Sequence, residues 1–114
     1  MKIEGTDISM IRGDSESLTI SCSNEKGEKV PFVAGDTVYL TVKKTAVNVE
    51  KAFQIIVTAF TEDGNAIMAI HHDDTKDLPF GTYVYDVQLS RLDGTVKTLI
   101  PVSKFVLEKE VTYD

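Results

Sequence analysis

Four consecutive residues, His71-His72-Asp73-Asp74, form the densest group of potential metal ligands in the chain. Imidazole and carboxylate groups are good ligands for zinc or iron. Neighbouring residues of a strand point to opposite faces, however, so the two histidines would not share one ion. The chain has no third histidine and no cysteine near this segment. The pattern favours the end of a strand followed by a helix cap, and we predict no metal site and no cofactor.

The tripeptide Arg12-Gly13-Asp14 matches the sequence that integrins recognise in adhesion proteins. A match of three residues is common by chance. Glycine between two strand-like segments is also typical of a tight turn, where it adopts dihedral angles that other residues avoid. We therefore predict a turn between the first two strands at this position.

Two Asp-Gly pairs, Asp63-Gly64 and Asp93-Gly94, could belong to calcium loops. The run of oxygen ligands ending in Glu that an EF-hand requires is absent, although adventitious calcium at an acidic loop stays open. Asp-Gly is the strongest short-range signal for a hairpin turn. Both pairs therefore predict hairpins, the first of them joining strands at 52–60 and 66–70.

No nucleophile is paired with a base in the sequence. Cys22 is the only cysteine, so it forms no disulfide within the chain, and it follows Leu18 and Ile20 at alternate positions. This spacing favours a small buried side chain over a catalytic thiolate. The sequence contains no G-x-S-x-G motif and no glycine-rich phosphate loop. A carboxylate pair for glycoside hydrolysis stays open, but none stands out, and we predict that the protein is not an enzyme.

The overall charge limits the partners that the chain can bind. Eighteen acidic residues against twelve basic ones give a formal net charge of −6. This balance argues against nucleic acid and against an anionic membrane surface. No apolar run approaches the roughly 20 residues that span a bilayer. The N-terminal sequence MKIEGTDISM lacks the apolar core of a signal peptide, so we expect one domain over 1–114 that is made in a cytoplasm.

Alternating apolar residues predict strands along the chain. The clearest run, Tyr83, Tyr85, Val87 and Leu89, is typical of a strand with one buried face. No segment keeps the period of a helix, and turn signals recur every 8–12 residues or so. The prediction is an all-β fold: a single immunoglobulin-like β-sandwich of seven to nine short antiparallel strands. Further strands are expected at 8–11, 18–22, 38–42, 52–60, 66–70, 96–100 and 105–111, with 45–51 either a loop or a wide connection.

The segment before the Tyr-rich strand predicts a crossover between sheets. Residues 73–78 indicate one helical turn, capped by Asp73 or Asp74. Immunoglobulin-like sandwiches place a tyrosine corner at such a crossover, in which a tyrosine hydroxyl bonds back to the preceding backbone. The sequence leaves open whether Tyr83 or Tyr85 has this role.

Ordered pieces spread over nearly the whole chain carry a family resemblance. They are RGDS (12–15) with LTI (18–20), FVAGDTV (32–38), EDGNA (62–66), DTKDLPFGTYVYDVQL (74–89) and GTVKTLIP (94–101) before Phe105. In this order they resemble a small protein of prophages and tailed phages of Gram-positive bacteria. That protein is similar to the N-terminal domain of the siphophage baseplate upper protein, an immunoglobulin-like β-sandwich. The helical stalk and distal domain of the baseplate protein have no counterpart in these 114 residues.

The resemblance implies a structural role in the virion tail, with synthesis in the host bacterial cytoplasm and no cofactor. The implied partners are other phage tail or baseplate proteins and, because virion assemblies are symmetric, further copies of the chain. Edge strands near 8–11 and 104–111 are the expected contact sites, since a neighbouring subunit can extend unpaired backbone groups. The tail from 108 to 114 is a further candidate.

A different class of function is a β-sandwich module that binds glycans or a cell surface. Such a module usually presents an exposed aromatic platform, and the chain contains no tryptophan. Tyr39 alternates with the apolar residues of its strand and is the best outward-facing candidate, followed by Tyr113 in the tail. An enzyme ranks third among the possible functions.

Overall fold

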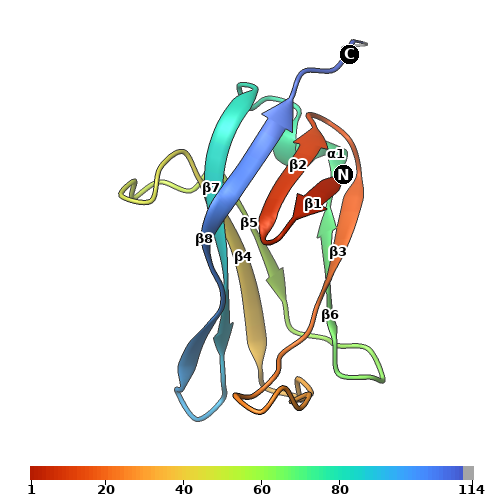
Figure 1. Cartoon of the computed structure of the whole chain (residues 1–114), viewed down its shortest axis with the longest axis vertical. Helices are drawn as coiled ribbons and strands as arrows, with labels where there is room; N and C mark the ends of the chain where they lie inside the picture. Colours follow the sequence, from red (N-terminus) through yellow and green to blue (C-terminus); the bar gives the residue numbers. More distant parts are fainter. Residues whose placement is uncertain (112–114) are drawn as a thin grey trace.

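A computed structural model describes residues 1–111, and within this range the chain forms eight strands and one short helix (Figure 1). They are β1 (Lys2–Glu4), β2 (Asp7–Ile11), β3 (Glu16–Ile20), β4 (Thr37–Lys43), β5 (Phe53–Val57), β6 (Ala66–Ile70), α1 (His72–Thr75), β7 (Gly81–Ser90) and β8 (Val96–Glu108). No helix in the described part of the chain is long and apolar enough to cross a membrane.

The strands form two sheets that share one hydrophobic core. The larger sheet has the order β1-β2-β8-β7-β4-β5, and the smaller sheet pairs β3 with β6. Strict alternation places Val38, Leu40 and Val42 of β4 inside with no exposed surface, while their neighbours face outward. Tyr83, Tyr85, Val87 and Leu89 of β7 are buried in the same way. These strands confirm the predicted all-β character. In each strand the inward-facing apolar side chains are buried, and this burial stabilises the strand against the core.

One pair of strands contradicts the expectation of a purely antiparallel fold. Residues Ile8–Ile11 of β2 run parallel to Phe105–Glu108 of β8. The segments predicted as edges at 8–11 and 104–111 therefore pair with each other, and β1 lies outside β2. Alternation of apolar residues carries no information about the direction or identity of a partner strand, which is why the sequence did not reveal this pairing.

The two Asp-Gly turns have different outcomes. Asp93-Gly94 joins β7 to its antiparallel neighbour β8, as predicted. Asp63-Gly64 also closes a turn, in which the Thr61 N–H donates to the Asn65 carbonyl at 3.0 Å. However, β5 ends at Val57 and pairs with β4, whereas β6 belongs to the other sheet. The predicted hairpin at this position is wrong, because turn chemistry sets a local reversal and not the partner of the strand that follows.

The helical turn begins earlier than predicted. It spans His72–Thr75 in place of 73–78, and His71 is its N-cap. The carboxylate of Asp74 accepts a hydrogen bond from the His71 backbone N–H at 2.8 Å. Neither Asp73 nor Asp74 is the cap residue, because β6 ends at Ile70 and the chain turns at the next residue.

The two tyrosines of β7 bond to different segments. The Tyr83 hydroxyl donates to the Pro79 carbonyl at 2.7 Å, within the crossover that leads into the strand. The Tyr85 hydroxyl donates to the Thr6 carbonyl, in the turn between β1 and β2. The bond back to the crossover, which the sequence left open between the two residues, therefore belongs to Tyr83.

Candidate functional site

One of the two histidines that suggested a metal site, His72, joins two loops. Nδ1 of His72 lies 2.6 Å from the Gly13 carbonyl oxygen, which connects α1 to the turn between β2 and β3. Asp73 forms an ion pair with Lys76 at 3.4 Å. Within residues 1–111, no group of three or more His, Cys, Asp or Glu side chains is placed to hold a metal ion. The strand end and helix start expected for this segment are confirmed.

Arg12 contacts other segments of its own chain. Gly13 occupies the turn between β2 and β3 with a φ of +84°, as the turn prediction requires. The Arg12 guanidinium forms an ion pair with Glu110 at 2.7 Å and donates to the Leu78 carbonyl at 3.1 Å, and its side chain is only 14% exposed. The hydrogen bond from Arg12 lowers the pKa of Glu110. The Arg-Gly-Asp sequence therefore fastens three distant segments together.

Cys22 and Asp93, which the sequence offered as a possible thiolate and a possible calcium ligand, both have structural roles. Cys22 is buried with 3% of its surface exposed, which confirms the predicted core position. The Asp93 carboxylate accepts the Thr95 N–H at 2.9 Å, and this bond lowers the pKa of Asp93. The carboxylate that could have been a calcium ligand therefore closes the β7–β8 turn.

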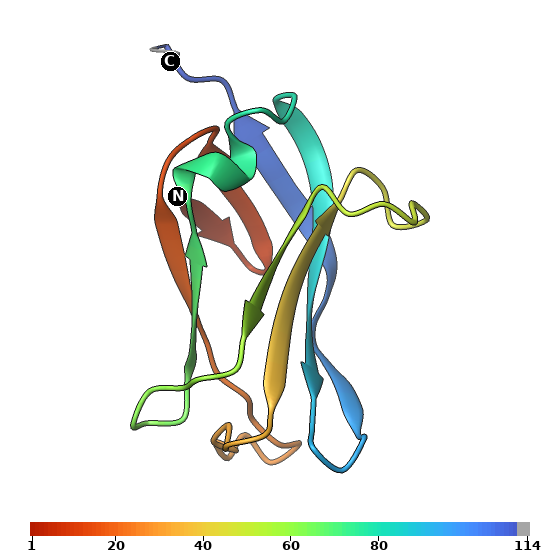
Figure 2. The ribbon, with the colours of Figure 1, turned by 180° about the vertical axis from the view of Figure 1, so that it is seen from behind.

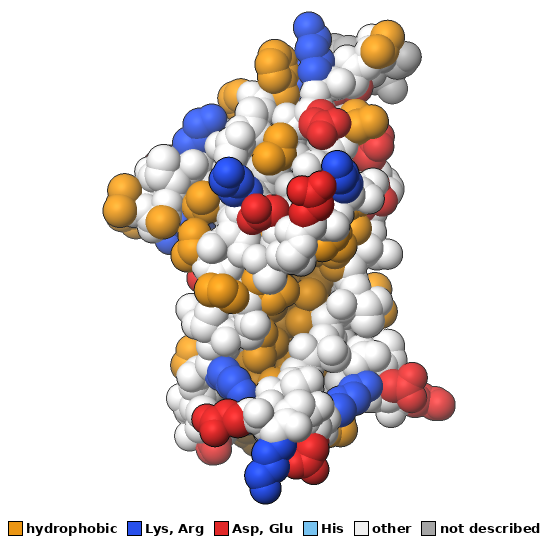
Figure 3. Space-filling view, viewed as in Figure 1, with side chains coloured by type: hydrophobic (Ala, Val, Ile, Leu, Met, Phe, Trp, Pro, Cys, Tyr) orange, Lys and Arg blue, Asp and Glu red, His pale blue; other side chains and the backbone are white. Residues whose placement is uncertain are grey.

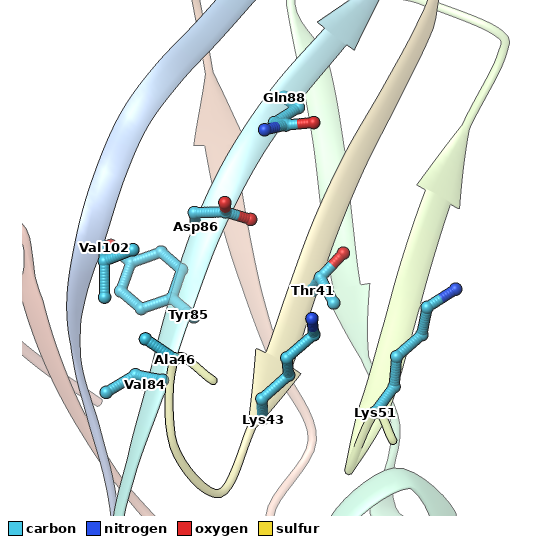
Figure 4. Close-up of a pocket in the computed structure, with 9 residues that line it drawn as sticks. All are labelled: Thr41, Lys43, Ala46, Lys51, Val84, Tyr85, Asp86, Gln88 and Val102. Carbon is cyan, nitrogen blue, oxygen red and sulfur yellow. The ribbon is translucent and has the colours of Figure 1, made fainter. Parts of the chain in front are cut away.

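A pocket of about 250 Å³ lies on the outer face of the larger sheet, beneath the loop between β4 and β5 (Figure 4). Buried and outward-facing residues alternate along β4 and β7, and the outward-facing ones line this pocket. The β4–β7 register places Thr41 opposite Asp86. The lining residues are Thr41, Lys43, Ala46, Lys51, Val84, Tyr85, Asp86, Gln88 and Val102.

The pocket combines a hydroxyl, a carboxylate, an amide and two ammonium groups. The Thr41 hydroxyl accepts from Gln54 at 2.9 Å, and the Gln54 amide oxygen accepts from Lys51 at 3.2 Å. Figure 4 shows Lys43 and Lys51 extending in the same direction along the sheet, with Asp86 on the neighbouring strand. Such a mixture of donors and acceptors suits a polar ligand rich in hydroxyl groups. The sequence does not reveal this set, because its members come from three strands and a loop.

The loop between β4 and β5 projects from the body of the protein (Figures 1 and 2). Its turn is closed by a hydrogen bond from Asn48 N–H to the Thr45 carbonyl at 3.2 Å. Val47 and Val49 at its tip are 90% and 92% exposed. Of the two predictions for 45–51, the loop is the one that the structure shows. Two apolar side chains this exposed on a projecting loop are a candidate contact site for another protein.

Tyr39 faces outward as predicted, but it does not form a free-standing platform. The side chain is half-buried on β4, with Ile56 of β5 and Gln88 of β7 opposite it in the two registers. It lies beside the pocket, because Gln88 also lines the pocket. Tyr113, the second aromatic candidate, lies outside the described residues.

A hollow with hydrophobic side chains is visible near the middle of the face shown in Figure 3, with charged side chains above and below it. On this side of the protein, β2 covers only Phe105–Glu108 of β8. Among residues 1–111, the remainder of β8 pairs only with β7, and it includes Pro101, which lacks an N–H group. This proline disfavours extension of the sheet along the uncovered part of β8.

Comparison of the chain with protein-family models, with curated proteins and with solved structures found no match. The strand order, the exposed loop and the polar pocket are therefore the structural observations that bear on function.

Proposed function

We propose that this chain is a non-enzymatic structural protein of a phage or prophage, a component of the tail or baseplate that acts through contacts with other proteins. The family resemblance of the ordered segments from Arg12 to Phe105 motivates this function. The observation that carries it is the strand order, which supports an immunoglobulin-like assignment.

In immunoglobulin-like sandwiches the second and fifth strands, B and E, pair in one sheet, and strands C, F and G form the other. The pairing of β3 with β6 and the order β8-β7-β4 are consistent with this arrangement when β3 and β6 are taken as B and E, and β4, β7 and β8 as C, F and G. β5 then extends the second sheet beside β4, as strand C′ does in variable-type domains. The order of pairing supports the immunoglobulin-like assignment.

Tyr83 supports the same assignment. It lies near the start of β7, and its hydroxyl donates to the Pro79 carbonyl four residues earlier. A tyrosine corner has this geometry, with a tyrosine at the start of strand F bonded to backbone a few residues upstream. The crossover, the tyrosine and the strand order are therefore mutually consistent.

Exposed apolar side chains support a role in assembly. Val47 and Val49 project from the β4–β5 loop, and Ile56 is 55% exposed on the adjacent outer face of β5. In Figure 3 the projecting loop shows hydrophobic side chains at the left of the molecule. Burying such residues against a neighbouring protein would be favourable, because their apolar surface would leave water.

The protein composition of tailed particles tests this function. Particles induced from cells that encode the chain are purified and analysed by quantitative mass spectrometry, and we expect the chain at a fixed ratio to the tail proteins. Replacing both Val47 and Val49 with Ser should reduce its incorporation several-fold. Val96→Ser, at a 63% exposed position in β8, is the control that should leave incorporation unchanged. Absence of the chain from every particle fraction would contradict a structural role in the tail.

The polar pocket favours a second candidate function, a module that binds glycans. Asp86, Gln88 and Lys43 provide acceptors and donors for sugar hydroxyls, and Tyr39 lies beside them. Retention on a cell-wall polysaccharide column, lost in both Tyr39→Ala and Asp86→Ala and kept in Lys97→Ala, is the expected result for this function. A chain that passes through such columns without delay would contradict glycan binding.

A further inference from the structure

The pocket on the outer face of the larger sheet contains charged groups that are not paired with each other. In the β4–β7 register Lys43 lies opposite Val84, and Thr41 lies opposite Asp86. Lys43 and Asp86 are therefore diagonal neighbours, within reach of a long side chain. Within residues 1–111, neither side chain forms an ion pair or a hydrogen bond with another residue. An ammonium group and a carboxylate thus line the pocket without using their bonding capacity inside the protein.

Asp86 is the more informative of the two groups, because its side chain is partly buried. A carboxylate that loses part of its water without gaining a partner raises the free energy of the folded protein. Figure 4 shows this carboxylate pointing across the face of the sheet toward β4. A cationic group on a ligand would supply the missing partner, because an ammonium group forms short, charge-assisted hydrogen bonds to a carboxylate.

The sheet is irregular at the position of this carboxylate. The β7–β8 register shifts between Tyr85 and Val87, the residues on either side of Asp86. Such irregularities are frequent beside active sites, where they redirect a side chain. Val102 of β8 is 57% exposed and lines the same pocket. In Figure 4 the Asp86 carboxylate therefore lies between an apolar side chain and the polar groups of β4.

Lysine side chains form the cationic part of the pocket. Lys51 donates to the Gln54 amide oxygen at 3.2 Å, and Gln54 donates to the Thr41 hydroxyl at 2.9 Å. Because the Thr41 oxygen accepts this bond, its own hydrogen remains available to a ligand. Figure 4 shows the ammonium group of Lys43 beside Thr41. These donors suit an anionic group, since charge-assisted hydrogen bonds are stronger than neutral ones.

The size of the pocket and its uncharged groups indicate a sugar. A volume of about 250 Å³ is below the roughly 300–1,000 Å³ of pockets for drug-sized ligands, so it suits one residue of a glycan. The Gln88 amide supplies both a donor and an acceptor for hydroxyl groups. Tyr39 lies opposite Gln88 on β4 and adds an aromatic ring beside the pocket.

We propose that this pocket binds a zwitterionic sugar, which carries an ammonium group and an anionic group in addition to its hydroxyl groups. Asp86 binds the ammonium group, and Lys43 and Lys51 bind the anionic group. This inference rests on the second candidate function, glycan binding, and names the class of ligand that its site takes. It does not depend on the role in the phage tail.

Binding of a matched set of sugars is the first test, measured by NMR titration of the full chain. Muramic acid carries both charges, N-acetylmuramic acid only the carboxylate, glucosamine only the ammonium group, and glucose neither. We expect muramic acid to bind about tenfold more tightly than either singly charged sugar, because each charge adds a charge-assisted hydrogen bond. Equal binding of muramic acid and glucose would overturn the proposal. Equally tight binding of alanine, a zwitterion without hydroxyl groups, would overturn the assignment to a sugar.

Variants that remove one charge are the second test. Asp86→Asn should abolish the preference for muramic acid over N-acetylmuramic acid and keep the preference over glucosamine. Lys43→Gln should do the reverse, with a several-fold loss of the preference over glucosamine. Lys97→Gln is the matched control and should bind as the natural protein does, since Lys97 is exposed on β8 and is not among the residues that line this pocket. Unchanged preferences in both pocket variants would contradict the assigned roles.

Thermal unfolding distinguishes a binding role of Asp86 from a structural one. Its carboxylate has no partner in the part of the chain that the structure describes. Asp86→Asn should therefore unfold at the same temperature as the natural protein or at a higher one, because it removes a partly desolvated charge. A clearly lower unfolding temperature would assign the carboxylate to the stability of the fold and overturn its role as a ligand-binding group.

Failure of this proposal is separable from failure of glycan binding. Retention on the cell-wall polysaccharide column without any preference for muramic acid would leave glycan binding and remove the zwitterionic ligand. A preference for muramic acid in a chain that the column does not retain would leave the class of ligand and remove the binding of wall polymers.

Discussion

Tyr83 and Tyr85 each anchor a different segment to β7, although they are only two residues apart. Both side chains are 3% exposed, and both hydroxyls donate to backbone carbonyl oxygens, in Pro79 and Thr6. Removal of either hydroxyl would leave a carbonyl oxygen without its partner. Although only Tyr83 bonds back to the crossover, we therefore expect both tyrosine hydroxyls to contribute to stability.

We predict that Tyr83→Phe and Tyr85→Phe each lower the free energy of unfolding by about 1 kcal/mol, the usual net contribution of one hydrogen bond. Urea denaturation followed by circular dichroism measures the change. Tyr39→Phe is the control, because the Tyr39 side chain is half-buried and makes no hydrogen bond within residues 1–111. Unchanged stability in both Tyr83→Phe and Tyr85→Phe would show that these hydroxyls contribute nothing.

The same two tyrosines predict a loss of stability at high pH. Burial raises the pKa of both Tyr83 and Tyr85, because it disfavours the phenolate. The unfolded chain therefore loses these protons at a lower pH than the folded protein does. The resulting stabilisation is complete below about pH 10, where an exposed tyrosine titrates, and declines as pH rises toward the folded pKa values. In the double Phe variant, unfolding experiments across this range should show a shallower decline.

Among the elements, the two Asp-Gly turns share one local chemistry and differ in their surroundings. Gly64 and Gly94 have φ values of +74° and +92°. A Cβ on Gly64 would lie 2.4 Å from the Cβ of Pro31, whereas a Cβ on Gly94 would meet nothing within 4 Å. The first turn thus packs against the loop before β4, and the second extends into solvent.

Gly94→Ala should cost about 1–2 kcal/mol, the penalty for placing an L-residue in the left-handed region. Gly64→Ala carries the same penalty and a steric clash with Pro31 in addition, so we expect it to cost about 3 kcal/mol or more. Thermal or urea unfolding of the two variants measures the difference. Equal losses would mean that the contact between Gly64 and Pro31 does not constrain the turn.

For the molecule as a whole, Arg12 joins segments that are far apart in sequence. Its guanidinium contacts Glu110 after β8 and the Leu78 carbonyl in the crossover, and it lies 5.5 Å from the centre of the Phe80 ring. The turn between β2 and β3 is thereby fastened to the end of the last strand. This contact contributes to the attachment of the parallel β2–β8 pair to the rest of the fold.

Acid should weaken this attachment. Because the hydrogen bond from Arg12 lowers the pKa of Glu110, the stabilisation is present above the pKa of the unfolded chain and is lost as pH falls through the folded pKa. Glu110→Gln should therefore be less stable at neutral pH and should show a shallower decline in acid. Glu108→Gln, at an exposed position in β8, is the control that should follow the natural protein. A Glu110→Gln profile identical to the natural one would exclude the proposed acid sensitivity.

Local patterns in the sequence determined most of the elements. Alternating apolar residues predicted β4 and β7, Asp-Gly pairs predicted both turns, and the position of Cys22 predicted its burial. Each of these depends on residues close together in the chain, because alternation and turn geometry are properties of a single segment.

Tertiary structure alone decided which strands became neighbours. The parallel β2–β8 pair and the assignment of β5 and β6 to different sheets depend on residues far apart in sequence. The polar pocket and the hydrogen bond from Tyr85 to Thr6 were decided in the same way. An alternating strand fits equally well beside any strand that covers its apolar face, so its partner follows only from packing of the whole chain.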